Sequence, residues 1–238
     1  MRHVLIVFIL LITSWSRAET IVVSVQEDLE KTPPIVELKN YFADALAKED
    51  IHVNFMPLSL ERGNFLANKG EIDGELIRTD YVLKNSPNLM ITSFPMIYTN
   101  FRVVRRKQIK NFKEKNLDTY VGVVFFNSPA VRATIERKKI KVENVATLDQ
   151  VFLLLASERA DYTILPDTII AAARDRQPLA FQNLVVSKNS FDRSELYFCL
   201  NKKNAHLMPK IEKALKRASR GPIWKYRYLP NLLNTEIP

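Results

Sequence analysis

Segments with the pattern of a buried strand alternate along this chain with segments that have the pattern of an amphipathic helix. β-Branched runs indicate strands, and apolar residues at every third or fourth position indicate helices. The elements predicted in the first half are strands at Ile21–Val25, His52–Leu58, Ile72–Arg78, Met90–Phe94 and Tyr98–Val104, with helices from Pro33 and from Ser59 to Asn68 between the first three. This order is typical of an open α/β sheet.

The same alternation starts again in the second half. The elements predicted there are strands at Tyr120–Phe126, Ile140–Val145, Asp161–Leu165, Leu184–Ser187 and Glu195–Asn201, and helices at Pro129–Lys139, Leu148–Glu158, Pro166–Ala173 and within the basic tail Ala205–Tyr228. Two sets of α/β elements predict two lobes of about 100 residues each, a normal domain size.

The first 18 residues have the pattern of an export signal. Arg2 and His3 precede an apolar run at Val4–Ile12, and the small residues Ser16 and Ala18 fit a signal peptidase site. The run is shorter than the roughly 20 residues of a membrane-spanning helix. A cleaved signal peptide over residues 1–18 is therefore predicted, with an N-terminal membrane anchor as the alternative. No cysteine lies near the cleavage point, so we expect a periplasmic protein that is not a lipoprotein.

The net charge of +9, from 35 Lys+Arg and 26 Asp+Glu, is typical of proteins that bind nucleic acids or membranes. Without residues 1–18 the chain has 33 Lys+Arg and 26 Asp+Glu, a net charge of +7. The export signal argues against a nucleic-acid partner, because an exported protein leaves the cytoplasm. The remaining positive charge points to the ligand or to an anionic membrane surface.

No motif of a catalytic, metal or cofactor site stands out. The sequence lacks G-x-S-x-G, G-x-x-x-x-G-K-[ST], G-x-G-x-x-G and H-E-x-x-H. Its single cysteine, Cys199, lies in an apolar run and is expected to be a buried, inert thiol. We predict no enzyme activity, no cofactor and no metal. An extracytoplasmic hydrolase stays as an alternative, because the spacing of carboxylates in the sequence does not tell which of them share a cleft.

Two oppositely charged residues lie at corresponding places in the two halves. Arg78 ends a predicted strand, and Asp167 follows the strand Asp161–Leu165. In open α/β sheets ligands bind beyond the carboxyl ends of strands, and arginine can hold a carboxylate through two hydrogen bonds. The two charges would suit the two ends of a zwitterion. The alternative is structural, with Arg78 paired to Asp80 and Asp167 stabilising a helix start.

The chain resembles the bacterial extracellular solute-binding protein family 3, the polar amino-acid type of periplasmic binding protein. The resemblance covers nearly the whole chain after residue 18, and three segments carry it: Leu60–Arg78 (LERGNFLANKGEIDGELIR), Tyr120–Val124 (YVGVV) and Leu153–Leu165 (LLLASERADYTIL). It implies a periplasmic binding protein-like α/β fold. Lobe 1 would contain residues 19–100 plus 195–238, lobe 2 would contain 101–194, and the hinge crossings would lie near 98–103 and 191–197.

The resemblance also implies a ligand site. Arg78 matches the residue that binds the α-carboxylate of the ligand, and Asp167 matches the one that takes its α-ammonium. Asn127 and Ser128 stand where the family has Gly-Thr, whose backbone N–H groups hold the carboxylate. Glu75 and Tyr98 complete the predicted set. The chain departs from the family in the loop at 26–34, which has no aromatic residue to stack on the ligand.

The predicted function is capture of a small polar ligand, an amino acid or related carboxylate, by hinge closure for an ABC-type transporter permease or a sensor. The protein is expected to be a monomer. Two alternatives remain. One is an extracytoplasmic enzyme on the same two-lobed fold, such as a lytic or dehydratase relative, and the other is a sensory or accessory module without a ligand.

Overall fold

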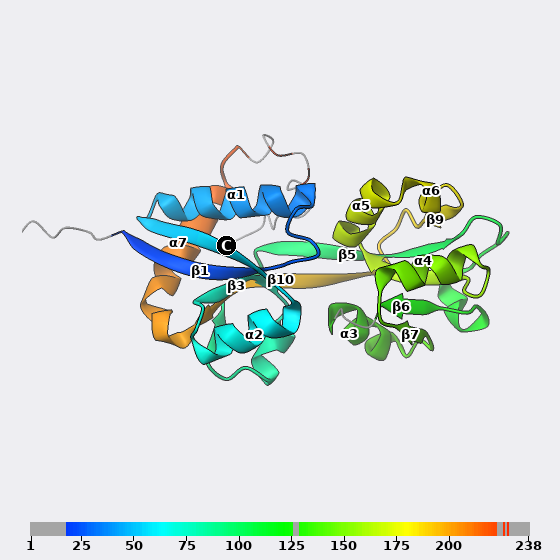
Figure 1. Cartoon of the computed structure of the whole chain (residues 1–238), viewed down its shortest axis with the longest axis horizontal. Helices are drawn as coiled ribbons and strands as arrows, with labels where there is room; N and C mark the ends of the chain where they lie inside the picture. The colour runs from blue at the N-terminus through cyan, green and yellow to red at the C-terminus, as the bar shows by residue number, and fades with distance from the viewer. Residues whose placement is uncertain (1–17, 126–128, 223–225, 227, 229–238) are drawn as a thin grey trace, which may run out of the picture.

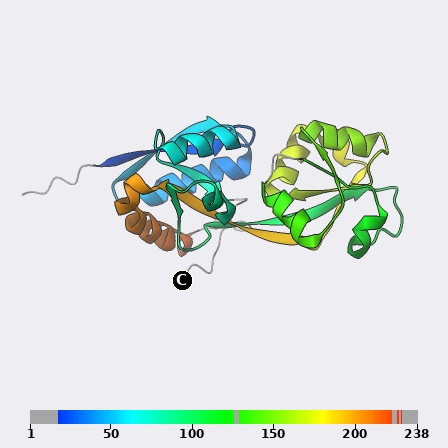
Figure 2. The ribbon, with the colours of Figure 1, turned by 90° about the horizontal axis from the view of Figure 1, so that it is seen from below.

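Two long antiparallel strands join two α/β lobes in the computed structural model (Figures 1 and 2). The model describes residues 18–125, 129–222, 226 and 228. The joining strands are β5 (Ile97–Arg106) and β10 (Asp192–Asn201), and the strand order of the main sheet is β2-β1-β3-β10-β5-β8. β10 pairs with β5 through its first half and with β3 and β4 through its second.

The lobe that contains the N-terminal strand is built on three parallel strands. Its elements are β1 (Glu19–Gln26), α1 (Pro33–Ala47), β2 (Ile51–Leu58), α2 (Leu60–Lys69), β3 (Gly74–Arg78), β4 (Leu89–Ile91), α7 (Met208–Ser219) and the 3₁₀ helices η1 (Asp80–Lys84) and η3 (Lys202–Leu207). Side chains alternate between the faces of a strand. Ile21, Val23 and Val25 therefore join α1 and α7 in one core, while Val22 packs on the smaller cluster with Ala67 of α2.

The second lobe packs its helices on both sides of β8 and the far half of β5. Its elements are η2 (Glu114–Thr119), β6 (Val123–Phe125), α3 (Pro129–Lys138), β7 (Glu143–Val145), α4 (Leu148–Ala156), β8 (Tyr162–Pro166), α5 (Asp167–Arg176), α6 (Pro178–Phe181) and β9 (Leu184–Val186). α4 and α5 cover one core and α3 lies over the other, which contains Phe101 and Tyr162. A Cβ at Gly122 would lie 2.5 Å from the Tyr162 ring, so this backbone approach requires glycine.

Capping residues in the sequence lie at the observed ends of the helices. The Ser59 hydroxyl accepts a hydrogen bond from the backbone N–H of Arg62, and Gly70 ends α2 with a left-handed φ of 79°. Thr147 and Gln150 form a capping box at the start of α4.

Strand ends and the tail were placed less well. Only Gly74–Arg78 of the predicted strand from Ile72 belongs to β3, and only Met208–Ser219 of the predicted tail helix belongs to α7.

Residues 1–17 of the predicted signal peptide lie outside the described residues, so cleavage stays a prediction. The exact lobe boundaries at 100/101 and 194/195 fall within the joining strands and stay a prediction as well. Among the described residues, no helix is long and apolar enough to cross a membrane.

The close approach of β3 to β10 gives a stability test. A Cβ at Gly74 would lie 2.2 Å from the carbonyl oxygen of Cys199, a backbone atom that cannot move without disturbing the sheet. We expect Gly74→Ala to lower the free energy of unfolding by at least about 2 kcal/mol in urea titrations.

Gly63→Ala is the matched control. Its new Cβ would meet the Ser24 hydroxyl at 2.8 Å, a side chain that can rotate, and alanine favours the α2 helix. We expect a loss below about 1 kcal/mol. Equal losses in the two variants would contradict the argument from backbone contact.

Candidate ligand-binding cleft

A cavity of about 120 Å³ lies between the lobes. Its lining comes from the ends of β1 and β3, from the first turns of three helices and from the joining strands. The lining residues are Gln26, Leu29, Ile35, Leu60, Ile77, Arg78, Thr79, Thr99, Phe101, Pro166, Thr168, Ile169 and Leu196. The cavity therefore lies where open α/β sheets bind ligands, beyond the carboxyl ends of strands.

Three helices start at this cavity. Ile35 belongs to the first turn of α1, Leu60 begins α2, and Thr168 belongs to the first turn of α5. The first N–H groups of a helix have no partner within the helix and carry partial positive charge. α1 adds no free N–H here, because its first two residues are prolines and the Ile35 N–H donates to the Thr32 carbonyl oxygen. The starts of α2 and α5 therefore make the cavity wall favourable to negative charge even where it carries no basic side chain.

Arg78 lines the cavity, and contacts within lobe 1 fix its guanidinium. Its guanidinium forms an ion pair with Glu75 and donates to the carbonyl oxygens of Leu60 (3.3 Å) and Ile77 (3.1 Å). The partner is Glu75 of the same strand, and not Asp80. Since a guanidinium has five N–H donors, this arrangement leaves donors for a ligand.

Glu75 is fully buried, with 0% of its side chain exposed. Its Oε1 accepts a hydrogen bond from Asn64 Nδ2 at 3.2 Å, and Asn64 in turn accepts one from the Ser86 hydroxyl at 2.9 Å. Glu75 thus fixes Arg78 from inside lobe 1 and does not itself line the cavity.

Asp167 lines a different cavity, of about 540 Å³, together with Asn100 and Arg102. It accepts hydrogen bonds from Arg102 Nε at 2.5 Å and from Asn100 Nδ2 at 3.4 Å. The structure therefore does not bring Arg78 and Asp167 into one cavity, and their predicted roles at the two ends of a zwitterion stay a prediction.

The other predicted ligand residues lie apart from the cavity or outside the described chain. The Arg193 guanidinium lies 3.4 Å from the centre of the Tyr98 ring, and Tyr98 does not line the cavity. Asn127 and Ser128 lie outside the described residues.

Thr99 is the residue that sequence reasoning missed. Its side chain is 3% exposed, it lines the cavity, and its hydroxyl has no hydrogen-bond partner in the described part of the chain. The signal was present in the strand pattern. Ile97, Phe101 and Val103 are buried positions in one phase of β5, and Thr99 is a buried polar residue in the same phase.

The loop after β1 contacts the opposite lobe. Leu29 packs on the large core of lobe 1 and on the α4–α5 core of lobe 2. The carbonyl oxygen of Asp28 accepts a hydrogen bond from Arg176 Nη2 at 2.7 Å. This loop, which lacks an aromatic residue, thus helps close the cavity with an aliphatic side chain.

Cys199 is not a candidate nucleophile. Burial raises the pKa of its thiol, and the nearby negative charge of Glu75 raises it further. The expectation of a buried, inert thiol is confirmed. Among the described residues no group of three or more His, Cys, Asp or Glu is arranged to hold a metal ion.

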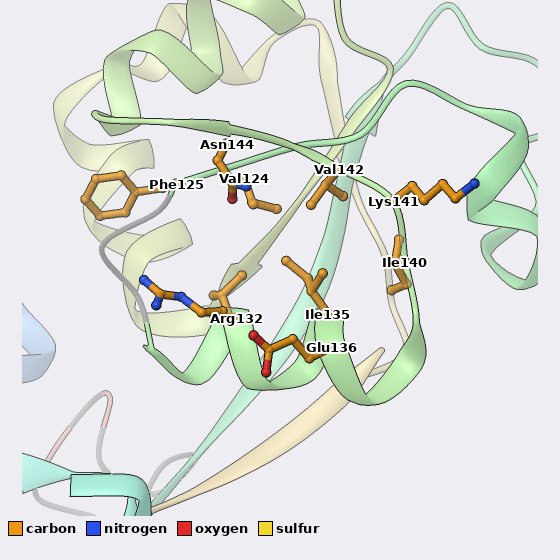
Figure 3. Close-up of a pocket in the computed structure, with 10 residues that line it drawn as sticks. Val124, Phe125, Arg132, Ile135, Glu136, Ile140, Lys141, Val142 and Asn144 are labelled. Atoms are coloured by element: carbon orange, nitrogen blue, oxygen red, sulfur yellow. The ribbon is translucent and has the colours of Figure 1, made fainter. Parts of the chain in front are cut away.

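A third cavity, of about 420 Å³, lies inside lobe 2 between α3 and the β6–β7 pair (Figure 3). Val124, Ile135 and Val142 face one another across it, with Arg132 and Glu136 on α3. No described residue of lobe 1 lines it, so it is separate from the cleft between the lobes.

Comparison with known proteins identifies the fold. No protein-family model matches the chain, and no curated protein matches it by sequence. An ancestral arginine-binding protein bound to glutamine superposes with a TM-score of 0.66 at 18% identity, covering 88% of this chain and 95% of that one.

Two further solved structures show the same likeness. A histidine kinase sensor domain with similarity to periplasmic binding proteins gives a TM-score of 0.65 at 16% identity, covering 84% of this chain and 90% of that one. A substrate-binding protein of an ABC uptake transporter from Streptococcus pneumoniae, with bound histidine, gives 0.64 at 14%, with coverages of 84% and 87%. The chain therefore has a periplasmic binding protein-like fold.

The ion pair between Arg78 and the buried Glu75 gives a second stability test. Arg78→Ala leaves the buried Glu75 carboxylate without its cation, and we expect the free energy of unfolding to fall by about 3–5 kcal/mol. The double variant Glu75→Gln/Arg78→Met removes both charges and should lose markedly less. Urea titrations measure both losses.

Arg62→Ala, at an exposed position on α2, is the control and should stay within about 0.5 kcal/mol of the parent. A single Arg78→Ala variant as stable as the parent would show that Glu75 does not depend on Arg78.

Proposed function

We propose that this chain is an exported solute-binding protein that captures a small polar ligand between its lobes. One observation carries the proposal. The cavity between the lobes is lined from both sides and combines an anchored arginine with a buried threonine hydroxyl that has no hydrogen-bond partner among the described residues. A ligand that touches both lobes favours the closed arrangement, because its contacts with the second lobe exist only there.

The ligand class proposed from the family resemblance is an amino acid or a related carboxylate. Arg78 would bind the carboxylate with the donors that Glu75 leaves free. Asn127 and Ser128 would supply backbone N–H groups, and Asp167 would take an ammonium group. Asp167 forms an ion pair with Arg102 in the adjacent cavity, while the residues on either side of it in the chain line this one.

The closed form would be read by a membrane permease of the ABC type or by a sensor. The mature protein would act in the periplasm as a monomer, without chemistry of its own. Proteins of transporters and of sensors share this fold. The fold therefore does not distinguish a permease partner from a sensor partner, whichever ligand is bound.

A sensory or accessory module without an exchangeable ligand is the second candidate. The contacts of the loop after β1 favour it, because Leu29 packs on the cores of both lobes and the Asp28 carbonyl oxygen accepts a hydrogen bond from Arg176, so the lobes hold each other directly. Small-angle X-ray scattering separates the two candidates. Capture requires a radius of gyration that falls when ligand is added, whereas the ligand-free module keeps one value in every solute.

A thermal-shift screen against amino acids and organic acids tests ligand capture directly. A ligand at about 100 times its Kd adds about 2.7 kcal/mol of stability, which should raise the melting temperature by roughly 5–10 °C for a chain of this size. No shift with any solute would count against the proposal.

Arg78→Lys tests the proposed anchor. Lysine keeps a positive charge beside Glu75 but loses the planar donors, so we expect the affinity for a carboxylate ligand to fall about tenfold or more in isothermal titration. Arg62→Lys, on the exposed face of α2, is the control and should bind as the parent does. Equal affinities in both variants would remove Arg78 from the site.

A further inference from the structure

The wall of the cavity between the lobes is mainly aliphatic. Its apolar side chains come from both lobes and from both joining strands: Leu29, Ile35, Leu60, Ile77, Phe101, Pro166, Ile169 and Leu196. None of the described residues that line it is acidic. A buried ammonium group needs a negative partner, and the described residues of this wall offer only neutral acceptors, such as the side chains of Gln26 and Thr168, to the ammonium end of an amino acid.

The positive charge around the cavity is enough for a ligand with a single negative charge. Arg78 is the one lining cation of the cavity among the described residues, and the first turns of α2 and α5 add partial positive charge. Glu75 lies behind Arg78 and offsets part of its charge. A monocarboxylate therefore meets a favourable field, while a second carboxylate would find no further cation.

The Thr99 hydroxyl is a second polar group that a ligand in this cavity can reach, and of the buried hydroxyls without a partner among the described residues it alone lines the cavity. It is buried, lines the cavity and lacks a hydrogen-bond partner in the described chain. Buried polar groups in folded proteins are almost always paired. A carboxylate oxygen in the cavity would accept the missing hydrogen bond.

The size of the cavity limits the ligand. An engineered cavity of about 150 Å³ holds benzene, which has six carbon atoms. The cavity here is about 120 Å³, which leaves space for about six non-hydrogen atoms.

Building on the proposed function, we propose that the cleft takes a short aliphatic monocarboxylate in preference to an amino acid. Its carboxylate binds Arg78 and Thr99, and its alkyl chain packs on Leu29, Ile77 and Leu196. Selectivity against amino acids comes from the absence of an acidic partner for an ammonium group among the described lining residues.

Three probes of nearly the same size test the ligand class by isothermal titration. They are butanoate, 2-aminobutanoate, which adds an ammonium group, and butanamide, which lacks the negative charge. We expect butanoate to bind at least about tenfold more tightly than either of the other two.

Thr99→Val tests the hydroxyl with little change in volume. We expect it to weaken butanoate binding about tenfold or more, because a hydrogen bond to a charged group is lost, without lowering the melting temperature of the free protein. Thr163→Val is the matched control. Thr163 is also a buried threonine whose hydroxyl has no partner in the described part of the chain, but it does not line this cavity. Its variant should therefore bind butanoate as the parent does.

The outcomes separate the ligand class from the proposed function. Binding of 2-aminobutanoate as tight as that of butanoate would overturn the ligand class and leave solute capture standing. Capture of another solute, with no binding of butanoate, would also overturn the ligand class and leave solute capture standing. Binding of no solute at all, with no change in small-angle scattering, would overturn both proposals. An unchanged butanoate affinity in Thr99→Val would overturn the assignment of Thr99.

Discussion

The fold depends on one short stretch of strand pairing. β5 and β10 pair over only five residues each, Ile97–Phe101 and Asp192–Leu196. On one side of this overlap β10 continues into the sheet of lobe 1, and on the other side β5 continues into the sheet of lobe 2. Because the overlap lies between the lobes, its buried face forms the floor of the cavity. Thr99 lies in the middle of it, opposite Ser194.

The cleft is less charged than the composition of the chain suggests. Residues 101–194 contain 17 Lys+Arg and 10 Asp+Glu, which accounts for the whole net charge of +7 that remains without residues 1–18. Much of this charge lies on exposed side chains such as Lys107, Lys113 and Lys139. In the cavity the described residues include one cation, Arg78, and its charge is partly offset by Glu75. Net charge therefore says little about the ligand, which meets a mainly aliphatic wall.

Sequence reasoning reached the fold because its signals are local. A run of β-branched residues, as at Ile21–Val25, indicates a buried strand. Capping residues such as Ser59 and Gly70 indicate where a helix begins and ends. Sequence reasoning was less successful with the site. Arg78 was expected to pair with a ligand or with Asp80, and its ion pair is with Glu75 three residues earlier on the same strand. The ion pair of Asp167 with Arg102 was not foreseen either, and the role of Asp167 at a ligand stays a prediction.

The sequence by itself determined the order of strands and helices, the α/β class, the strand-end position of Arg78 and the buried state of Cys199. Each of these follows from side-chain patterns within about ten residues. Only the tertiary structure decided which side chains share a cavity, because that depends on how the β5–β10 overlap sets one lobe against the other. It placed Thr99 and Leu29 at the cleft and paired Asp167 with Arg102, since contacts between residues distant in sequence leave no local pattern.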